Sequence, residues 1–230
     1  MELTFLGHAC LHLAHDAGAV LVDPFITGNP KCSGVDLNAL EVTDILLTHG
    51  HEDHVLDAPA IAAREGVRTF AAYEVAQWVR EQGGLDVVGM NHGGTVNLNG
   101  GTARMVAAVH SSTLPDGRPG GNPAGFVIDL NGTRVYHAGD TALTKDMELI
   151  GEHWPCKYAA LPLGGHFTMD WKDGLIAAKM CGALEVIALH FDTFPPISIP
   201  MDEKVAARSA FEAAGIRLHF LEIGEKMDLV

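Results

Sequence analysis

The chain has 230 residues, of which 47% are hydrophobic, 7% aromatic and 19% charged. This is the composition of a globular protein, and it excludes a disordered or fibrous chain. The 15 Lys and Arg against 29 Asp and Glu give a formal net charge of −14. Because no run of basic residues provides a local positive patch, we expect no nucleic-acid partner.

The sequence also argues against membranes and secretion. No stretch reaches the roughly 18 apolar residues that a membrane span needs, and the N-terminus lacks the basic start and apolar run of a signal peptide. The four cysteines, Cys10, Cys32, Cys156 and Cys181, are scattered, unlike those of a disulfide-rich secreted domain. We therefore expect a cytoplasmic protein with reduced thiols and no membrane partner. The sequence leaves open whether the chain forms a homo-oligomer.

Short apolar runs bounded by Gly, Pro, Asn or Asp predict ten strands. In chain order these are 3–6, 19–22, 45–48, 68–71, 104–109, 125–130, 133–137, 158–161, 185–189 and 217–220. Helical patterns predict four helices, at 58–65, 74–82, 171–181 and 202–214. Asp57 and Asp170 are the expected N-caps of the first and third helices.

The segment 111–125 is rich in Gly and Pro and predicts a long loop, which in a compact domain is usually functional. We expect it to line the rim of the active site together with 32–39. Strands on both sides of this loop suggest two α/β halves with helices covering stacked sheets. Because no linker separates the halves, residues 1–230 are expected to form a single α/β domain.

The strongest chemical signal is His49-x-His51-x-Asp53-His54, which directly follows the apolar run 45–47. Imidazole and carboxylate are ligands favoured by zinc, iron and manganese. Four such groups so close together would repel or titrate one another unless a cation held them. The motif therefore predicts a metal site rather than a polar turn.

Three more candidate ligands occur where apolar runs stop. His110 follows 105–109, Asp140 lies just after 135–137, and His190 follows 186–189. Ligands at the ends of strands can converge on one edge of a sheet, so we expect these residues to join the first motif.

In type, order and spacing, these residues resemble the signature of the metallo-β-lactamase superfamily. The likeness extends to Gly7-His8-Ala9-Cys10, Val22-Asp23-Pro24-Phe25, Gly139-Asp140-Thr141, Gly164-Gly165-His166-Phe167 and Thr193-Phe194-Pro195. This set is similar to a small branch of metal-dependent hydrolases near the ascorbate-6-phosphate lactonases. The resemblance implies a four-layer αββα sandwich with a dinuclear centre at one edge.

Carried over by position, the resemblance implies that His49, His51 and His110 hold one metal. Asp53, His54 and His190 would hold the other, with Asp140 bridging both. Glu52 departs from the pattern, because relatives often carry a small residue there. The expected cofactors are two divalent ions, Zn or Mn, with Fe as an alternative.

A hydroxide on such a pair of metals would attack a small ester, lactone or phosphoester. Asp53 is expected to accept the proton of the water. By resemblance, His8 and His166 would lie near the pocket as further catalytic residues, with His166 as a hydrogen-bond or proton donor to the substrate. Ser111 and Ser112, beside His110, could orient substrate.

Three alternatives to this hydrolase remain open at the level of sequence. Some proteins with this fold carry out iron-dependent oxygen chemistry with a 2-His-1-carboxylate site. Others are nucleases or phosphodiesterases, although two divalent ions would leave this chain at about −10, without the basic surface that nucleases use. The last alternative is a non-catalytic protein that binds a metal or a metabolite.

Overall fold

The computed structural model describes residues 1–230 and contains two seven-stranded sheets. The first has the order β14-β1-β2-β3-β4-β5-β6 and the second β13-β12-β11-β10-β9-β8-β7. The strands of the first sheet are β1 (Glu2–Phe5), β2 (Leu11–His15), β3 (Gly18–Val22), β4 (Asp44–Leu47), β5 (Arg68–Ala72), β6 (Asp86–Met90) and β14 (Lys226–Asp228). Those of the second are β7 (Thr95–Leu98), β8 (Gly101–Ala107), β9 (Ala124–Leu130), β10 (Thr133–His137), β11 (Tyr158–Pro162), β12 (Glu185–Leu189) and β13 (Arg217–His219).

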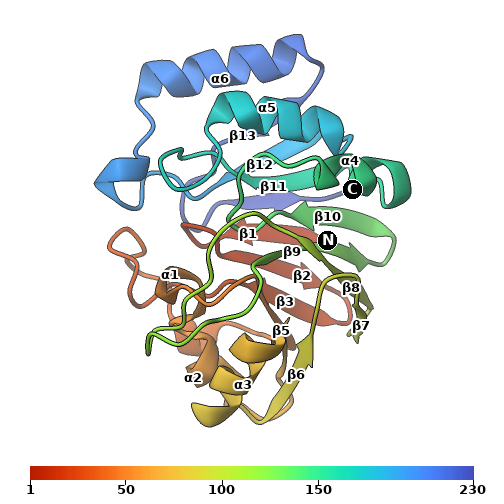
Figure 1. Ribbon diagram of the computed structural model, residues 1–230. Helices are drawn as coiled ribbons and strands as arrows, with labels where there is room; N and C mark the ends of the chain where they lie inside the picture. The colour runs from red at the N-terminus through yellow and green to blue at the C-terminus, as the bar shows by residue number, and fades with distance from the viewer.

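Helices cover both outer faces of the paired sheets (Figure 1). The lower group in that view comprises α1 (Glu52–Val55), α2 (Ala58–Ala62) and α3 (Tyr73–Glu81), and the upper group α4 (Asp146–His153), α5 (Trp171–Met180) and α6 (Met201–Ala213). Two short 3₁₀ helices, η1 (Leu37–Ala39) and η2 (Pro195–Ile197), lie in loops. The predicted four-layer α/β sandwich is therefore confirmed.

One hydrophobic core joins the two sheets. A cluster of 47 buried residues includes Leu3 and Leu11 from the first sheet and Phe126 and Ile187 from the second. Strands β4, β11 and β12 are buried along their whole length, as expected for parallel strands that are covered on both faces. A second cluster of 19 buried residues packs α2 and α3 against the first sheet.

Each sheet combines antiparallel pairs with a run of three parallel pairs. In the first sheet, β3 to β6 run parallel, and in the second, β10 to β13 do. Strand β8 runs in the same direction as β10, because both are antiparallel to β9. The carboxyl ends of these strands therefore lie at one edge of each sheet, where their loops can meet.

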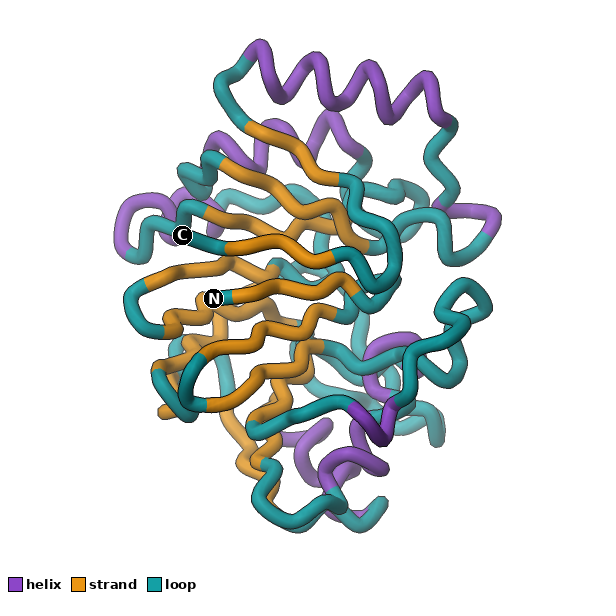
Figure 2. Tube along the Cα trace, turned by 180° about the vertical axis from the view of Figure 1, so that it is seen from behind, coloured by secondary structure: helices purple, strands orange, loops and turns teal.

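The two ends of the chain pair with each other at one edge of the first sheet. Strand β14 pairs antiparallel with β1, and Figure 2 shows the two termini close to each other. The Leu229 N–H donates to the Met1 carbonyl at 2.8 Å. None of the helices combines the length and the apolar character needed to cross a bilayer.

All ten predicted strands and all four predicted helices exist; β10 and β12 have the predicted bounds, and the other elements have shifted ends. The main differences are the helix predicted at 58–65, which ends at Ala62, and the strand predicted at 104–109, which spans Gly101–Ala107. The prediction missed β2, β6, β7, β14, α1 and α4. Helix α4 lacks a side-chain N-cap, since Lys145 makes no capping bond, so its start gives no sequence signal.

Of the two predicted N-caps, Asp170 is confirmed and Asp57 is not. The Asp170 carboxylate accepts from the backbone N–H groups of Lys172 and Asp173, which confirms it as the cap of α5. Asp57 makes no capping bond. Its carboxylate instead accepts from the N–H groups of Ile26 and Thr27 and from the Thr27 hydroxyl, because a buried acceptor bonds the donors of the neighbouring turn.

Candidate metal centre

The predicted ligands gather at the carboxyl ends of the strands. Three groups of side chains have ligand atoms that all lie within 4.8 Å of one another, and two of them consist of predicted site residues. These two are His49, His51 and His110, and His8, Asp53, His54 and His190; the third joins Asp23 to His49 and His54. The His49–His54 motif follows β4, and its last three residues begin the single turn α1. His110 comes after β8, and His190 directly follows β12.

Asp140 lies between the two groups. Its Oδ2 is 3.0 Å from His190 Nε2, 3.5 Å from His54 Nε2 and 3.6 Å from His110 Nε2. The Asp140 side chain is only 2% exposed. One carboxylate oxygen therefore faces imidazole nitrogens from both groups.

A buried aspartate that was not among the predicted site residues orients two of the imidazoles. Asp23 follows β3, and its carboxylate accepts from His54 Nδ1 at 2.8 Å and from the Thr48 hydroxyl at 2.6 Å. Because that hydroxyl proton is donated to Asp23, the Thr48 oxygen accepts from His49 Nδ1, 3.0 Å away. Both imidazoles thus present Nε2, the nitrogen that can bind a metal, toward the centre.

Left-handed backbone is concentrated around this cluster. His8, Asp23 and His190 have φ values of 55°, 46° and 51°, a region that costs non-glycine residues about 1–3 kcal/mol each. Such strain persists where the surrounding structure enforces it. Here it turns the chain sharply as each strand ends, so that the side chains point into the centre.

Burial sets the protonation of most of the imidazoles. It lowers the pKa of His49 well below its usual value and also lowers those of His51 and His110. These three groups are therefore neutral at pH 7, which is the form that binds a metal ion.

The carboxylates and His54 behave differently. Burial opposes charge on His54, but Asp140 and Asp23 outweigh it and raise its pKa well above the usual value. Burial likewise opposes the charge of Asp140, but His54 and His190 hold the pKa of that carboxyl well below its usual range. The centre thus stabilises positive charge between its carboxylates.

Several buried polar atoms at the centre lack a hydrogen-bond partner. They are His54 Nε2, Asp140 Oδ1 and His190 Nδ1. Unpartnered buried polar atoms are uncommon in folded proteins, and here they belong to imidazole and carboxylate groups, the ligand types of divalent transition metals. The residues present therefore fit a metal centre.

His8 is part of the cluster but is almost completely buried. It is 1% exposed, and its Nε2 lies 3.1 Å from Asp53 Oδ2. Burial lowers the pKa of His8 to about 4, although the hydrogen bond that His8 donates to Asp53 opposes this shift. The Asp53 side chain is 31% exposed; although burial opposes its charge, the bond to His8 and the nearby His54 lower its pKa. His8 is thus placed to act through Asp53.

His166 belongs to the loop after β11 and is in neither group of candidate ligands. It is exposed, has a φ of 58°, and makes no hydrogen bond. Its loop approaches the cluster at Gly164, where an added Cβ would lie 2.0 Å from the His190 carbonyl oxygen. Glu52, which departs from the family pattern, is also exposed.

The long loop contacts the histidine motif. Ser111 Oγ lies 3.2 Å from His51 Nε2, and Ser112 Oγ accepts from the Gly50 N–H at 3.0 Å. Residues 108–123 contain no helix or strand, only an isolated bridge between Thr113 and Pro119.

Asp23 and Thr193 are the contributors that sequence reasoning missed. Asp23 ends the apolar strand β3, so the rule that selected His110, Asp140 and His190 could also have selected it. Thr193 does not directly follow an apolar run, although it belongs to the Thr193-Phe194-Pro195 motif of the family resemblance. It joins the centre only because its hydroxyl lies 3.0 Å from His8 Nδ1, across 185 residues of sequence.

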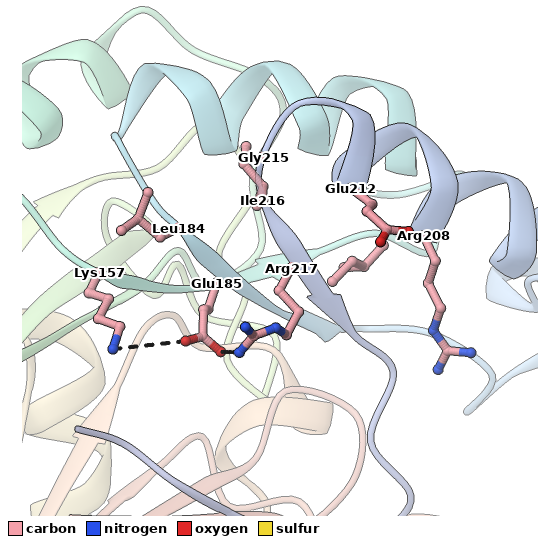
Figure 3. Close-up of a pocket in the computed structure, with 9 residues that line it drawn as sticks. Lys157, Leu184, Glu185, Arg208, Glu212, Gly215, Ile216 and Arg217 are labelled. Atoms are coloured by element: carbon pink, nitrogen blue, oxygen red, sulfur yellow. Dashed lines mark hydrogen bonds and ion pairs between the residues drawn. The ribbon is translucent and has the colours of Figure 1, made fainter.

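Two other cavities differ from this centre in their chemistry. A cavity of about 690 Å³ lies between β12, β13 and α6 and contains none of the candidate ligands (Figure 3). Its buried Glu185 is neutralised by Arg217 at 3.0 Å and Lys157 at 3.9 Å. A second cavity, of about 560 Å³, touches the centre only at His8 and Thr193.

Comparisons with known proteins agree with this geometry. The family model described as "Beta-lactamase superfamily domain" matches residues 19–191. A "UPF0173 metal-dependent hydrolase" of Flavobacterium johnsoniae is 42% identical over 229 residues, covering 100% of both chains. A "UPF0173 metal-dependent hydrolase" of Thermus thermophilus is 41% identical over 229 residues, which cover 100% of this chain and 99% of that protein.

Solved structures show the same fold. Igni18, described as a novel metallo hydrolase from Ignicoccus hospitalis, superposes with a TM-score of 0.86 at 35% identity, covering 98% of this chain and 97% of that one. An isothiocyanate hydrolase from Delia radicum gut bacteria has a TM-score of 0.77 at 21% identity, covering 100% of this chain and 99% of its own, and shares the fold. The chain therefore belongs to the β-lactamase superfamily, as one of its metal-dependent hydrolases.

Proposed function

We infer that the chain hydrolyses a small ester, lactone or phosphoester at a centre that holds two divalent cations. His49, His51 and His110 would hold one cation and Asp53, His54 and His190 the other, with Asp140 as a ligand shared by both. The observation that carries this assignment is the position of Asp140 Oδ2, within 3.6 Å of imidazole nitrogens from both groups.

When bound, a pair of Zn²⁺ or Mn²⁺ ions would lower the pKa of a coordinated water and polarise a carbonyl or phosphoryl oxygen. The protein side chains prepare the site for this chemistry. Asp23 directs Nε2 of His54 toward the centre and, through Thr48, that of His49. The carboxylates of Asp53 and Asp140 compensate the positive charge of the cations.

The two carboxylates have different roles because their exposure differs. Asp140 is 2% exposed and serves only as a ligand, whereas Asp53 is 31% exposed and can meet water and substrate. We assign Asp53 as the acceptor of the proton from the attacking water. His8 donates to its Oδ2 and leaves the other oxygen available.

His166 is the proposed donor to the substrate. It is exposed on the loop that follows β11, and this loop packs against His190 through Gly164. A hydrogen bond or proton from an exposed imidazole here would stabilise the leaving group, which is a common role of histidine in hydrolysis.

Elemental analysis of gently purified protein is the test. We expect about two Zn or Mn ions per chain, as the metals of a dinuclear hydrolase, and fewer in Asp140→Ala. Glu52→Gln is the matched control, because Glu52 lies within the motif but is exposed. Wild type should then hydrolyse members of a panel of lactones, thioesters and phosphodiesters.

Other outcomes would redirect or overturn the proposal. A single iron ion per chain would point to oxygen-dependent chemistry. Salt-sensitive binding of RNA or DNA would point to a nuclease, and tight metabolite binding without product to a sensor. If no reloading condition gave a bound metal, the dinuclear mechanism would be wrong.

A further inference from the structure

A chain of hydrogen bonds links three segments that are distant in the sequence. Thr193 Oγ1 lies 3.0 Å from His8 Nδ1, and His8 Nε2 lies 3.1 Å from Asp53 Oδ2. His8 belongs to the turn after β1, Thr193 to the loop after β12, and Asp53 to α1. Thr193 and His8 are 4% and 1% exposed, so bulk water does not compete for the bond between them.

The chemistry of the groups fixes the direction of the bonds. An ionised carboxylate only accepts, so His8 Nε2 carries the proton that is donated to Asp53. In a neutral imidazole the other nitrogen then has a lone pair and accepts. The Thr193 hydroxyl is thus the donor to Nδ1. The alternative acceptor for that hydroxyl, the Phe191 carbonyl, is farther away at 3.4 Å.

The surrounding packing holds the His8 ring in place. Its centroid lies 5.6 Å from that of Phe25, 5.7 Å from that of Phe194 and 4.3 Å from that of His190. The His8 carbonyl also accepts from the His190 N–H at 2.8 Å. A flip of the ring would exchange each nitrogen with a carbon, and the hydrogen bonds of Nδ1 to Thr193 and of Nε2 to Asp53 are what distinguish the two orientations.

We propose that Thr193 is a positioning residue that stabilises the Nε2–H tautomer of His8, which the Asp53 carboxylate requires, and thereby holds that carboxylate at the metal centre. The role of Asp53 as ligand and proton acceptor rests on the proposed function. Without the Thr193 hydroxyl, Nδ1 becomes a buried acceptor with no partner, which costs about 1–3 kcal/mol. The ring then loses the interaction that orients Nε2 toward Asp53.

The test compares Thr193→Val, which removes the hydroxyl at nearly constant shape, with Thr193→Ser, which retains it. Thr69→Val is the matched control, because Thr69 is completely buried on β5 and its hydroxyl has no partner. Two measurements are made: the ¹⁵N NMR signals of the His8 ring, without metal and with Zn²⁺, and Zn²⁺ affinity in competition with a chromophoric chelator.

We expect wild type to show His8 neutral and protonated at Nε2. In Thr193→Val the resonance of His8 Nδ1 should move downfield, because its hydrogen bond is lost. The Zn²⁺ affinity should fall roughly tenfold, which is the lower end of the range for removing a hydrogen-bond partner of a metal ligand. Thr193→Ser should restore both values, and Thr69→Val should leave both unchanged.

The proposal is overturned if wild-type His8 carries its proton on Nδ1. It is also overturned if Thr193→Val keeps the wild-type Nδ1 resonance and Zn²⁺ affinity, or if Thr69→Val weakens Zn²⁺ binding equally. If Thr193→Val does not fold, the wild-type tautomer and the Thr193→Ser protein still decide the matter. A protein with the expected spectra and affinities but no hydrolysis would refute the proposed function and leave the role of Thr193 intact.

Discussion

The Asp23 carboxylate lies 2.8 Å from His54 Nδ1, and both side chains are completely buried. The same carboxylate accepts from the Thr48 backbone N–H and hydroxyl. It therefore connects the turn after β3 to the histidine motif after β4. A carboxylate behind a metal-binding imidazole fixes its tautomer and increases its basicity.

Replacing Asp23 by Asn should weaken metal binding. The amide cannot accept as a charged group, so His54 loses the partner that directs its Nε2 toward the centre. We expect Zn²⁺ affinity to fall about 10–100-fold, measured by competition with a chelator. Asp36→Asn serves as control, since Asp36 is exposed and caps η1. An unchanged affinity in Asp23→Asn would refute the orienting role of Asp23.

Substitution of Gly139, the residue before Asp140, should destabilise the protein for two separate reasons. Gly139 has a φ of 63°, and an added Cβ would lie 2.4 Å from the Ala124 carbonyl oxygen and 2.9 Å from Thr48 Cβ. Gly132 has a φ of 85° but open space around it. Gly132→Ala should lower the free energy of unfolding only by the cost of placing alanine in left-handed backbone, about 1–2 kcal/mol.

Gly139→Ala should lower the free energy of unfolding further than Gly132→Ala does, and it should also reduce metal content, because relief of the clash moves Asp140. Urea unfolding and elemental analysis measure the two effects. Equal losses of stability in both variants, with full metal content, would contradict the prediction.

The two aspartates expected as caps should differ in their contribution to stability. Asp170→Ala removes an N-cap and should cost about 1 kcal/mol. Asp57→Ala leaves the buried N–H of Ile26 and the N–H and hydroxyl of Thr27 without their acceptor, which should cost about 3 kcal/mol or more. Urea unfolding of the two variants beside wild type tests the order, and a larger loss in Asp170→Ala would contradict it.

The reactivity of the four cysteine thiols should depend strongly on pH and on burial. The thiolate is the reactive form, and burial raises the pKa of Cys156 to about 12 and that of Cys181 to about 11. At pH 8 the thiolate fraction of Cys181 is then about one in a thousand. Burial also raises the pKa of Cys10 well above its usual value.

Cys32 is the least buried thiol, and its pKa is raised less than that of Cys10. Iodoacetamide at pH 8 should therefore modify Cys32 first in the folded protein and all four cysteines in urea. Mass spectrometry of wild type and Cys32→Ser measures this. Rapid modification of Cys181 in folded Cys32→Ser would contradict the prediction.

Much of the fold could be predicted because it depends on local patterns. The strands that were predicted, such as β10 and β12, are short apolar runs with clear boundaries. The missed strand β14 has only three residues and pairs with β1 at the opposite end of the chain. No local pattern specifies such a pairing, because its stability comes from contacts between residues more than 200 positions apart.

The sequence by itself determined the set of candidate metal ligands, because residue type and spacing are local properties. His49, His51, Asp53 and His54 occur together in one turn, and His110, Asp140 and His190 each follow an apolar run. Only the tertiary structure decided which groups support them. Asp23 orients His54, and Thr193 contacts His8 across 185 residues, because a hydrogen bond depends on distance and direction in space, which the order of residues does not contain.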